Sequence, residues 1–210
     1  MHTLRSVLAF ALLLLPGAAA AEAVDDVKQS FLAYKTAIIA ADGEAAAEVV
    51  TEGSHDYFRK LADQALTLDR EGLHDINLGD RVYSMLLRHS LDRSQLESMS
   101  GEDVVSYAVD EGWIGRENAG QLQLGNYEVE GETASGTILR PDGGATTFKM
   151  EFVKEDGRWL LDLVALMNLT RAAFDFAVQQ SGLSEDEFVV LMLEAGTGRK
   201  PGPDIWSPPL

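Results

Sequence analysis

The spacing of apolar side chains changes along this chain, from the period of a helix to that of a strand and back. From Ala23 to Ala41, apolar residues recur at every third or fourth position, which predicts an amphipathic helix. The same spacing continues through the first half of the chain, so we expect that half to be helical. The further helices are expected over 44–50, from an N-cap at Ser54 to a break at Gly72, from near Asp80, and from Ser100 to Gly112.

From about Gln121 the apolar positions alternate instead, which is typical of half-buried strands. Pro141-Asp142-Gly143-Gly144 separates two alternating runs, and Glu155-Asp156-Gly157 precedes a third run, from Arg158 to Leu166. Turns of this composition between alternating runs predict hairpins. The strands are therefore expected to form one antiparallel β-meander.

Helical spacing returns after the strands, over 169–180 and 184–195, with Ser184 and Glu187 at the spacing of a capping box. The last segment, 196–210, holds four prolines and three glycines, too many for a regular element. It also carries Trp206, whose apolar bulk predicts that the segment docks on the body of the protein. We expect a single α+β domain over 22–195, followed by a tail over 196–210 that docks through Trp206.

The first residues have the three parts of a secretory signal peptide. Arg5 precedes an apolar run from Val7 to Leu15, and small residues lead to an expected cleavage after Ala21. The run is about nine residues, whereas a membrane-spanning helix needs about twenty. The sequence thus predicts residues 1–21 to be a cleaved signal peptide and the domain to be exported without a membrane span. The destination is the periplasm in a Gram-negative host and the exterior otherwise.

Charge and composition narrow the classes of function. The formal net charge of −17 would repel a phosphate backbone, so we expect no nucleic-acid partner. The chain has no cysteine, which excludes disulfides, thiolate catalysis and cysteine-based zinc sites. Its histidines lack metal-binding spacing, so we expect neither a metal nor a cofactor.

One segment resembles a known superfamily. From Thr146 to Leu163 a strand leads through Glu155-Asp156-Gly157 into a strand of the form Arg-Trp-x-x-Asp, and helices precede the whole. This arrangement resembles the nuclear transport factor 2-like superfamily over roughly residues 24–166. The resemblance implies a cystatin-like cone in which a curved antiparallel sheet wraps a long N-terminal helix around an apolar cavity. The helices over 72–112 and after the sheet are additions, and they are expected to fill or cover that cavity.

Four residues are candidates for a functional site. Asp162, inside an apolar strand, and His74, beside Asp75, are candidate proton-transfer groups. Tyr107, Arg140 and Asp162 are candidate ligand-binding residues if the Asp162 face of the sheet is the concave one. If it is the outer face, which we favour, Asp162 is a solvated strand residue, and the histidines are better read as surface residues than as catalytic ones.

Superfamily membership alone does not choose a function, because the members include isomerases, dehydratases, ligand-binding proteins and domains without chemistry. With no recognisable catalytic set, we expect a non-enzymatic domain that binds a small apolar ligand or a protein partner. One alternative is a cavity enzyme of the isomerase or dehydratase type that uses Asp162 with a histidine. The other is a structural or assembly role through the tail and Trp206.

Overall fold

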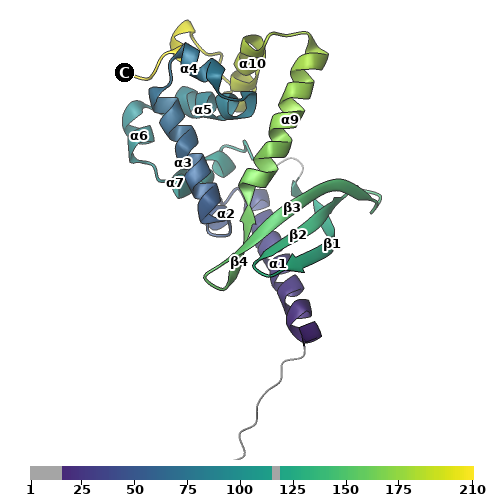
Figure 1. Ribbon diagram of the computed structural model, residues 1–210. Coiled ribbons are helices and arrows are strands. Elements are labelled where there is room, and N and C mark those ends of the chain that lie inside the picture. Colours follow the sequence, from purple (N-terminus) through teal and green to yellow (C-terminus); the bar gives the residue numbers. More distant parts are fainter. Residues whose placement is uncertain (1–15, 115–118) are drawn as a thin grey trace, which may run out of the picture.

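The computed structural model describes residues 16–114 and 119–210 and has an α+β fold (Figure 1). The N-terminal helix α1 lies against an antiparallel sheet, α2–α7 and α10 form a helical layer beyond it, and α9 runs from the sheet into that layer. This confirms the predicted fold class of N-terminal helices packed on an antiparallel meander with additional C-terminal helices. The elements are α1 (Pro16–Ala40), α2 (Gly43–Ala47), α3 (Glu52–Thr67), α4 (Arg70–Asp75), α5 (Leu78–Ser90), α6 (Arg93–Ser98), α7 (Gly101–Asp110), β1 (Gln123–Glu130), β2 (Thr133–Leu139), β3 (Ala145–Glu155), β4 (Arg158–Asp162), α9 (Leu163–Ser181), α10 (Glu185–Thr197) and the 3₁₀ turn η1 (Pro203–Trp206).

The expected signal peptide falls mostly outside the described residues. Its basic residue and its apolar run from Val7 to Leu15 are not among them, and α1 begins at Pro16. The buried face of α1 carries Val27, Phe31 and Ile38, at helical spacing. This face packs against the sheet through β4 and β1.

The N-cap of α3 lies three residues before the predicted one. Thr51, not Ser54, is the capping residue, and its hydroxyl oxygen accepts a hydrogen bond from the Ser54 backbone nitrogen. Ser54 is fully buried, and its own hydroxyl oxygen accepts a hydrogen bond from the Leu163 nitrogen at 2.9 Å. The prediction was wrong because both residues are good caps, and the tertiary contact with α9 decides which one begins the helix.

The predicted break at Gly72 is also misplaced. The chain turns at Leu68 and Asp69, and Gly72 lies inside α4, where its backbone nitrogen donates to the Asp69 side chain. The short helix α6 was not predicted, although Asp92 and Gln95 form a capping box at its start. Both errors concern helices of a single turn or two, which are too short for a periodic pattern.

The sheet is the predicted meander, with strand order β1-β2-β3-β4 and antiparallel pairing throughout. The two tight turns lie where the sequence placed them, with Gly143 and Gly157 at positive φ. The last strand is shorter than predicted, because β4 ends at Asp162 and α9 begins at Leu163. Beyond the free side of β4, the Thr51 nitrogen donates to the Leu161 carbonyl at 3.1 Å, and the Leu161 nitrogen donates to the Val49 carbonyl at 2.9 Å.

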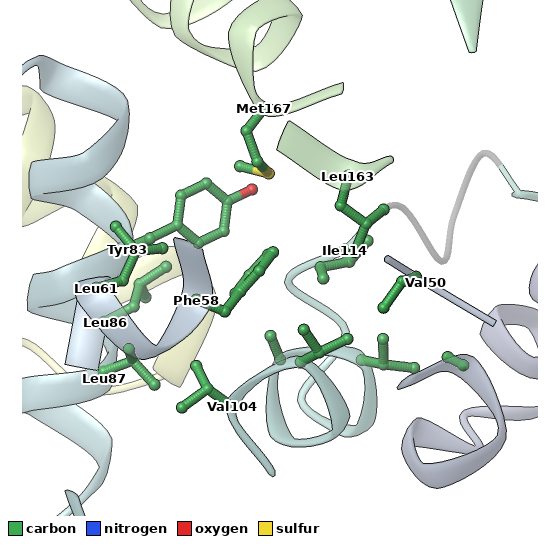
Figure 2. Packing of buried hydrophobic residues seen from close by; sticks show 14 of the residues in the cluster. Val50, Phe58, Leu61, Tyr83, Leu86, Leu87, Val104, Ile114, Leu163 and Met167 are labelled. Atoms are coloured by element: carbon green, nitrogen blue, oxygen red, sulfur yellow. The ribbon is translucent and has the colours of Figure 1, made fainter. Parts of the chain in front are cut away.

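One apolar core extends from α1 and the sheet into the helical layer, where α3, α5 and α7 contribute Phe58, Leu61, Leu87 and Val104 (Figure 2). Helix α7 approaches α3 so closely that a Cβ atom on Gly101 would lie 2.0 Å from the His55 carbonyl oxygen. A side chain at this position is therefore incompatible with the observed packing.

The C-terminal segment folds back onto the helical layer. Ile205 is buried, and its carbonyl accepts a hydrogen bond from the Arg88 guanidinium at 3.2 Å. The Trp206 ring lies under the Arg70 guanidinium, 4.9 Å from the ring centroid, and edge-on to His74. The segment is therefore packed against α4 and α5 instead of projecting into solvent.

Candidate functional site

An apolar cleft of about 600 Å³ opens where α9 meets the helical layer. Ligand pockets of proteins measure roughly 300–1,000 Å³, so the cleft has the size of a small-molecule site. Its walls come from α5, from residues 111–114 after α7, from the first half of α9, and from the end of α10. The lining residues include Tyr83, Leu86, Glu111, Trp113, Thr170 and Phe174.

Helical spacing brings the α9 side chains of the cleft onto one face. Leu166, Thr170 and Phe174 are four residues apart, so they lie one above another along the helix. The start of α9 is held by Asp162, whose Oδ1 accepts hydrogen bonds from the Val164 and Ala165 nitrogens at 2.8 Å and 3.4 Å. The position at which the strand becomes a helix thus sets which α9 residues face the cleft.

Aromatic rings form much of the cleft wall. Tyr83 and Phe174 stack with 6.5 Å between ring centroids and 23° between planes, and Phe174 also meets Phe188 edge-on. On another wall, Trp113 packs edge-on against Tyr107, and its indole nitrogen donates to the Gly196 carbonyl at 3.1 Å. These contacts hold the rings of the cleft in defined positions.

The Tyr83 hydroxyl belongs to a largely buried residue of the cleft wall. Figure 2 shows it directed towards Met167, and both residues line the cleft. Only 8% of Tyr83 is exposed, and within the described ranges no hydrogen bond joins its hydroxyl to another residue. Burial raises the pKa of the Tyr83 phenol to about 12. The hydroxyl is therefore neutral and free to donate a hydrogen bond to a bound molecule.

A second, smaller cavity of about 160 Å³ lies between α1 and the sheet. Ile114 and Leu166 line both this cavity and the cleft, so they form the partition between them. Tyr34 lines the cavity, and in the part of the chain that the structure describes its buried hydroxyl has no hydrogen-bond partner. Burial, with a smaller contribution from the nearby Tyr83 phenol, raises the pKa of Tyr34. Apolar space thus continues behind the cleft, with a second neutral phenol beside it.

The four residues singled out from the sequence lie apart from one another and do not line the cleft. Asp162 is half-buried and caps α9. His74 lies in the last turn of α4, where its Nε2 is 3.0 Å from an Asp186 carboxylate oxygen. Tyr107 stands behind Trp113, and Arg140 lies in the β2–β3 turn with its Nε 3.5 Å from Asp142.

No hydrogen bond, ion pair or ring contact joins any pair of these residues in the described ranges, so Asp162 and His74 are not brought together there. The residues that do line the cleft were not singled out. Tyr83 stood in the apolar stripe of α5 beside Val82 and Leu86, which indicates burial and nothing more. Phe174 lies in the helix predicted over 169–180, whose apolar spacing likewise indicates packing alone.

Over residues 16–114 and 119–210, no group of three or more acidic or histidine side chains is placed to hold a metal ion. In the same ranges, no helix has the length and apolar character that crossing a membrane requires.

Comparisons of this chain with protein-family models, with curated proteins and with solved structures give no match. The cleft itself is therefore the basis on which a function is proposed.

Proposed function

We propose that this protein is an exported, non-enzymatic binding protein that holds a small apolar ligand in the cleft between α5, α9 and α10. The observation that carries the proposal is the cleft, which combines a volume of about 600 Å³ with aromatic walls and the Tyr83 hydroxyl, which has no hydrogen-bond partner among the described residues. An apolar pocket with a few polar groups is the usual form of a small-molecule site.

Native mass spectrometry of the full chain, expressed in a Gram-negative host and purified without detergent, tests the binding proposal. We expect a discrete additional mass that disappears on denaturation. Ala195→Trp fills the cleft from α10 and should abolish the additional mass, whereas Leu191→Trp, on the exposed side of the same helix, should retain it. Equal retention by both variants would remove the cleft from consideration.

Export is a separate part of the proposal, supported by the signal-like residues 1–21. Fractionation of the same host and intact-mass measurement test it. We expect the protein in the periplasmic fraction, with Glu22 as its first residue. Cytoplasmic protein of full-length mass would contradict export without affecting the binding proposal.

Membership of the nuclear transport factor 2-like superfamily is likewise a proposal. It is supported by α1 lying along the antiparallel meander and by the Glu155-Asp156-Gly157 turn between β3 and β4. The cavity between α1 and the sheet lies where a cone of that kind would have its interior. The larger cleft lies outside this region, among the additional helices.

A protein partner is the second candidate, favoured by an exposed apolar groove of about 510 Å³ between β3 and α9. Phe148 on β3 lines the groove and is 52% exposed. Phe176, which lies further along α9 than the lining residues, is 62% exposed. Exposed aromatic side chains of this size are enriched at protein contacts. Replacing both with serine should abolish co-purification of a partner and leave ligand retention unchanged.

A further inference from the structure

From the chemistry of the cleft, we infer that its ligand is an uncharged, largely apolar molecule whose one carbonyl or hydroxyl oxygen accepts a hydrogen bond from the Tyr83 hydroxyl. The inference rests on the proposed function and specifies the ligand class of the same cleft. Three features of the described residues lead to it: the state of the Tyr83 hydroxyl, the charges at the cleft, and its aromatic walls.

The Tyr83 hydroxyl has no hydrogen-bond partner in the described ranges, and only 8% of the residue is exposed. The residue lines the cleft, so a molecule that enters the cleft, water or ligand, can accept a hydrogen bond from this hydroxyl. The ring is held by stacking on Phe174, which keeps the hydroxyl in its place in the cleft wall. A ligand oxygen in the cleft would satisfy it where it lies.

Among the described residues, the charges at the cleft disfavour an anionic head group. None of the described residues that line it is basic, and the one charged side chain among them is Glu111. A carboxylate or phosphate in the cleft would be desolvated without a cation and would face Glu111, within a protein of net charge −17. The free fatty acids and other organic acids that an apolar cleft might otherwise hold are thus disfavoured against neutral molecules of the same size.

A cationic ligand is disfavoured by the interior of the cleft. Glu111 is exposed, so it can attract a cation to the rim but does not accompany it inside. Tyr83, Trp113 and Phe174 offer ring faces and edges, which suit a flat or ring-containing neutral molecule. The hydroxyl of Thr170 is already directed to the Leu166 carbonyl at 3.4 Å, which leaves Tyr83 as the principal donor.

Three matched probes test the inference by isothermal titration calorimetry with the intact exported protein. 2-Acetylnaphthalene carries a carbonyl acceptor, 2-ethylnaphthalene has nearly the same shape without one, and 2-naphthoate carries a negative charge. We expect the ketone to bind most tightly and the carboxylate most weakly. In Tyr83→Phe, which keeps the ring and its stacking, affinity for the ketone should fall about fivefold, the effect of one net hydrogen bond, while affinity for the hydrocarbon should not fall.

Tyr127→Phe serves as the control, because Tyr127 lies on β1 and does not line the cleft. It should preserve the affinities for all three probes, and thermal melting establishes that both variants are folded. Equal binding of ketone and hydrocarbon by the wild type, an unchanged ketone affinity in Tyr83→Phe, or tightest binding of 2-naphthoate would overturn the inference and leave the proposed function standing. If no probe binds and no ligand is retained in native mass spectra, the proposed function fails with it.

Discussion

Asp80 and Arg171 form an ion pair between α5 and α9, with 3.1 Å between Oδ1 of the carboxylate and the guanidinium nitrogen. The Asp80 side chain is only 5% exposed, and the same carboxylate oxygen accepts a hydrogen bond from the Tyr57 hydroxyl at 2.6 Å. Burial and this hydrogen bond raise the pKa of Tyr57. The three residues connect α3, α5 and α9, so they fix the two helices that supply Tyr83 and Phe174 to the cleft.

Removing the positive partner should destabilise this junction. We expect Arg171→Met to lower the free energy of unfolding by about 1–3 kcal/mol, because it leaves a buried carboxylate with the Tyr57 hydroxyl alone. The estimate is below that for a fully buried pair because Arg171 is 34% exposed. Urea denaturation measures it, with Arg140→Met as the control, since Arg140 and Asp142 are both well exposed and their pair should contribute little. Equal stability of the two variants would contradict this role.

Asp162 is predicted to act as a helix cap and not as a proton-transfer group. Asp162→Ala should lower the free energy of unfolding by about 1 kcal/mol, because the Val164 and Ala165 nitrogens lose their acceptor. Asp162→Asn keeps an acceptor oxygen and should be close to wild type in stability and in ligand retention. A loss of ligand in the Asn variant at unchanged stability would instead assign Asp162 a part in binding.

Gly101 on α7 and Gly53 on α3 differ in the space around them, so substitutions at the two positions test the close approach of these helices. A Cβ on Gly101 would meet backbone atoms of His55, which cannot move aside, so Gly101→Ala should cost about 3 kcal/mol or prevent folding. A Cβ on Gly53 would have nothing within 4 Å, and Gly53→Ala should stabilise α3 by about 0.5 kcal/mol. Thermal and chemical denaturation compare the two. Similar effects of both substitutions would refute the packing of α7 on α3.

The buried phenols should make the fold sensitive to high pH. The pKa values of Tyr34, Tyr57 and Tyr83 are raised in the folded protein, chiefly by burial, whereas unfolded tyrosines ionise near 10. Above about pH 10 the unfolded state loses protons that the folded state retains, so the stabilisation present below pH 10 declines as the pH rises towards the raised values.

Absorbance at 295 nm and circular dichroism, recorded together from pH 8 to 13, measure this effect. We expect these tyrosines to ionise with the loss of secondary structure, and Tyr83→Phe to shift the unfolding transition to higher pH. Ionisation of every tyrosine near pH 10 with the helices intact would contradict the observed burial.

The sequence predicted elements whose signals are local. Ser184 with Glu187, and Pro141 to Gly144, determine a helix start and a hairpin through contacts within a few residues, and both lie where predicted. The end of β4 was mispredicted because alternating apolar residues at 159, 161 and 163 run into a helical stripe that begins without a break. Asp162 therefore read as an interior strand residue, whereas it is the last residue of β4 and the N-cap of α9.

The cleft was beyond prediction for a different reason. An apolar stripe that includes Tyr83 indicates that the residue is buried, but it does not indicate whether the neighbouring side chains fill the space around the residue. That depends on the approach of α9 to α5, which the Asp80–Arg171 pair sets between residues 91 positions apart. Periodicity carries no information about such a contact.

The contacts beyond β4 have a consequence for association in concentrated solution. An uncovered edge strand can recruit a strand from another molecule and so begin edge-to-edge aggregation. Here residues 49–51 already occupy the main-chain groups of Leu161 on one edge. At the other edge, β1 is interrupted by a bulge between Gly125 and Glu128, and it carries the negative charges of Glu128 and Glu130. Both edges of the sheet thus oppose the addition of a further strand, so its growth into an intermolecular sheet would require partial unfolding first.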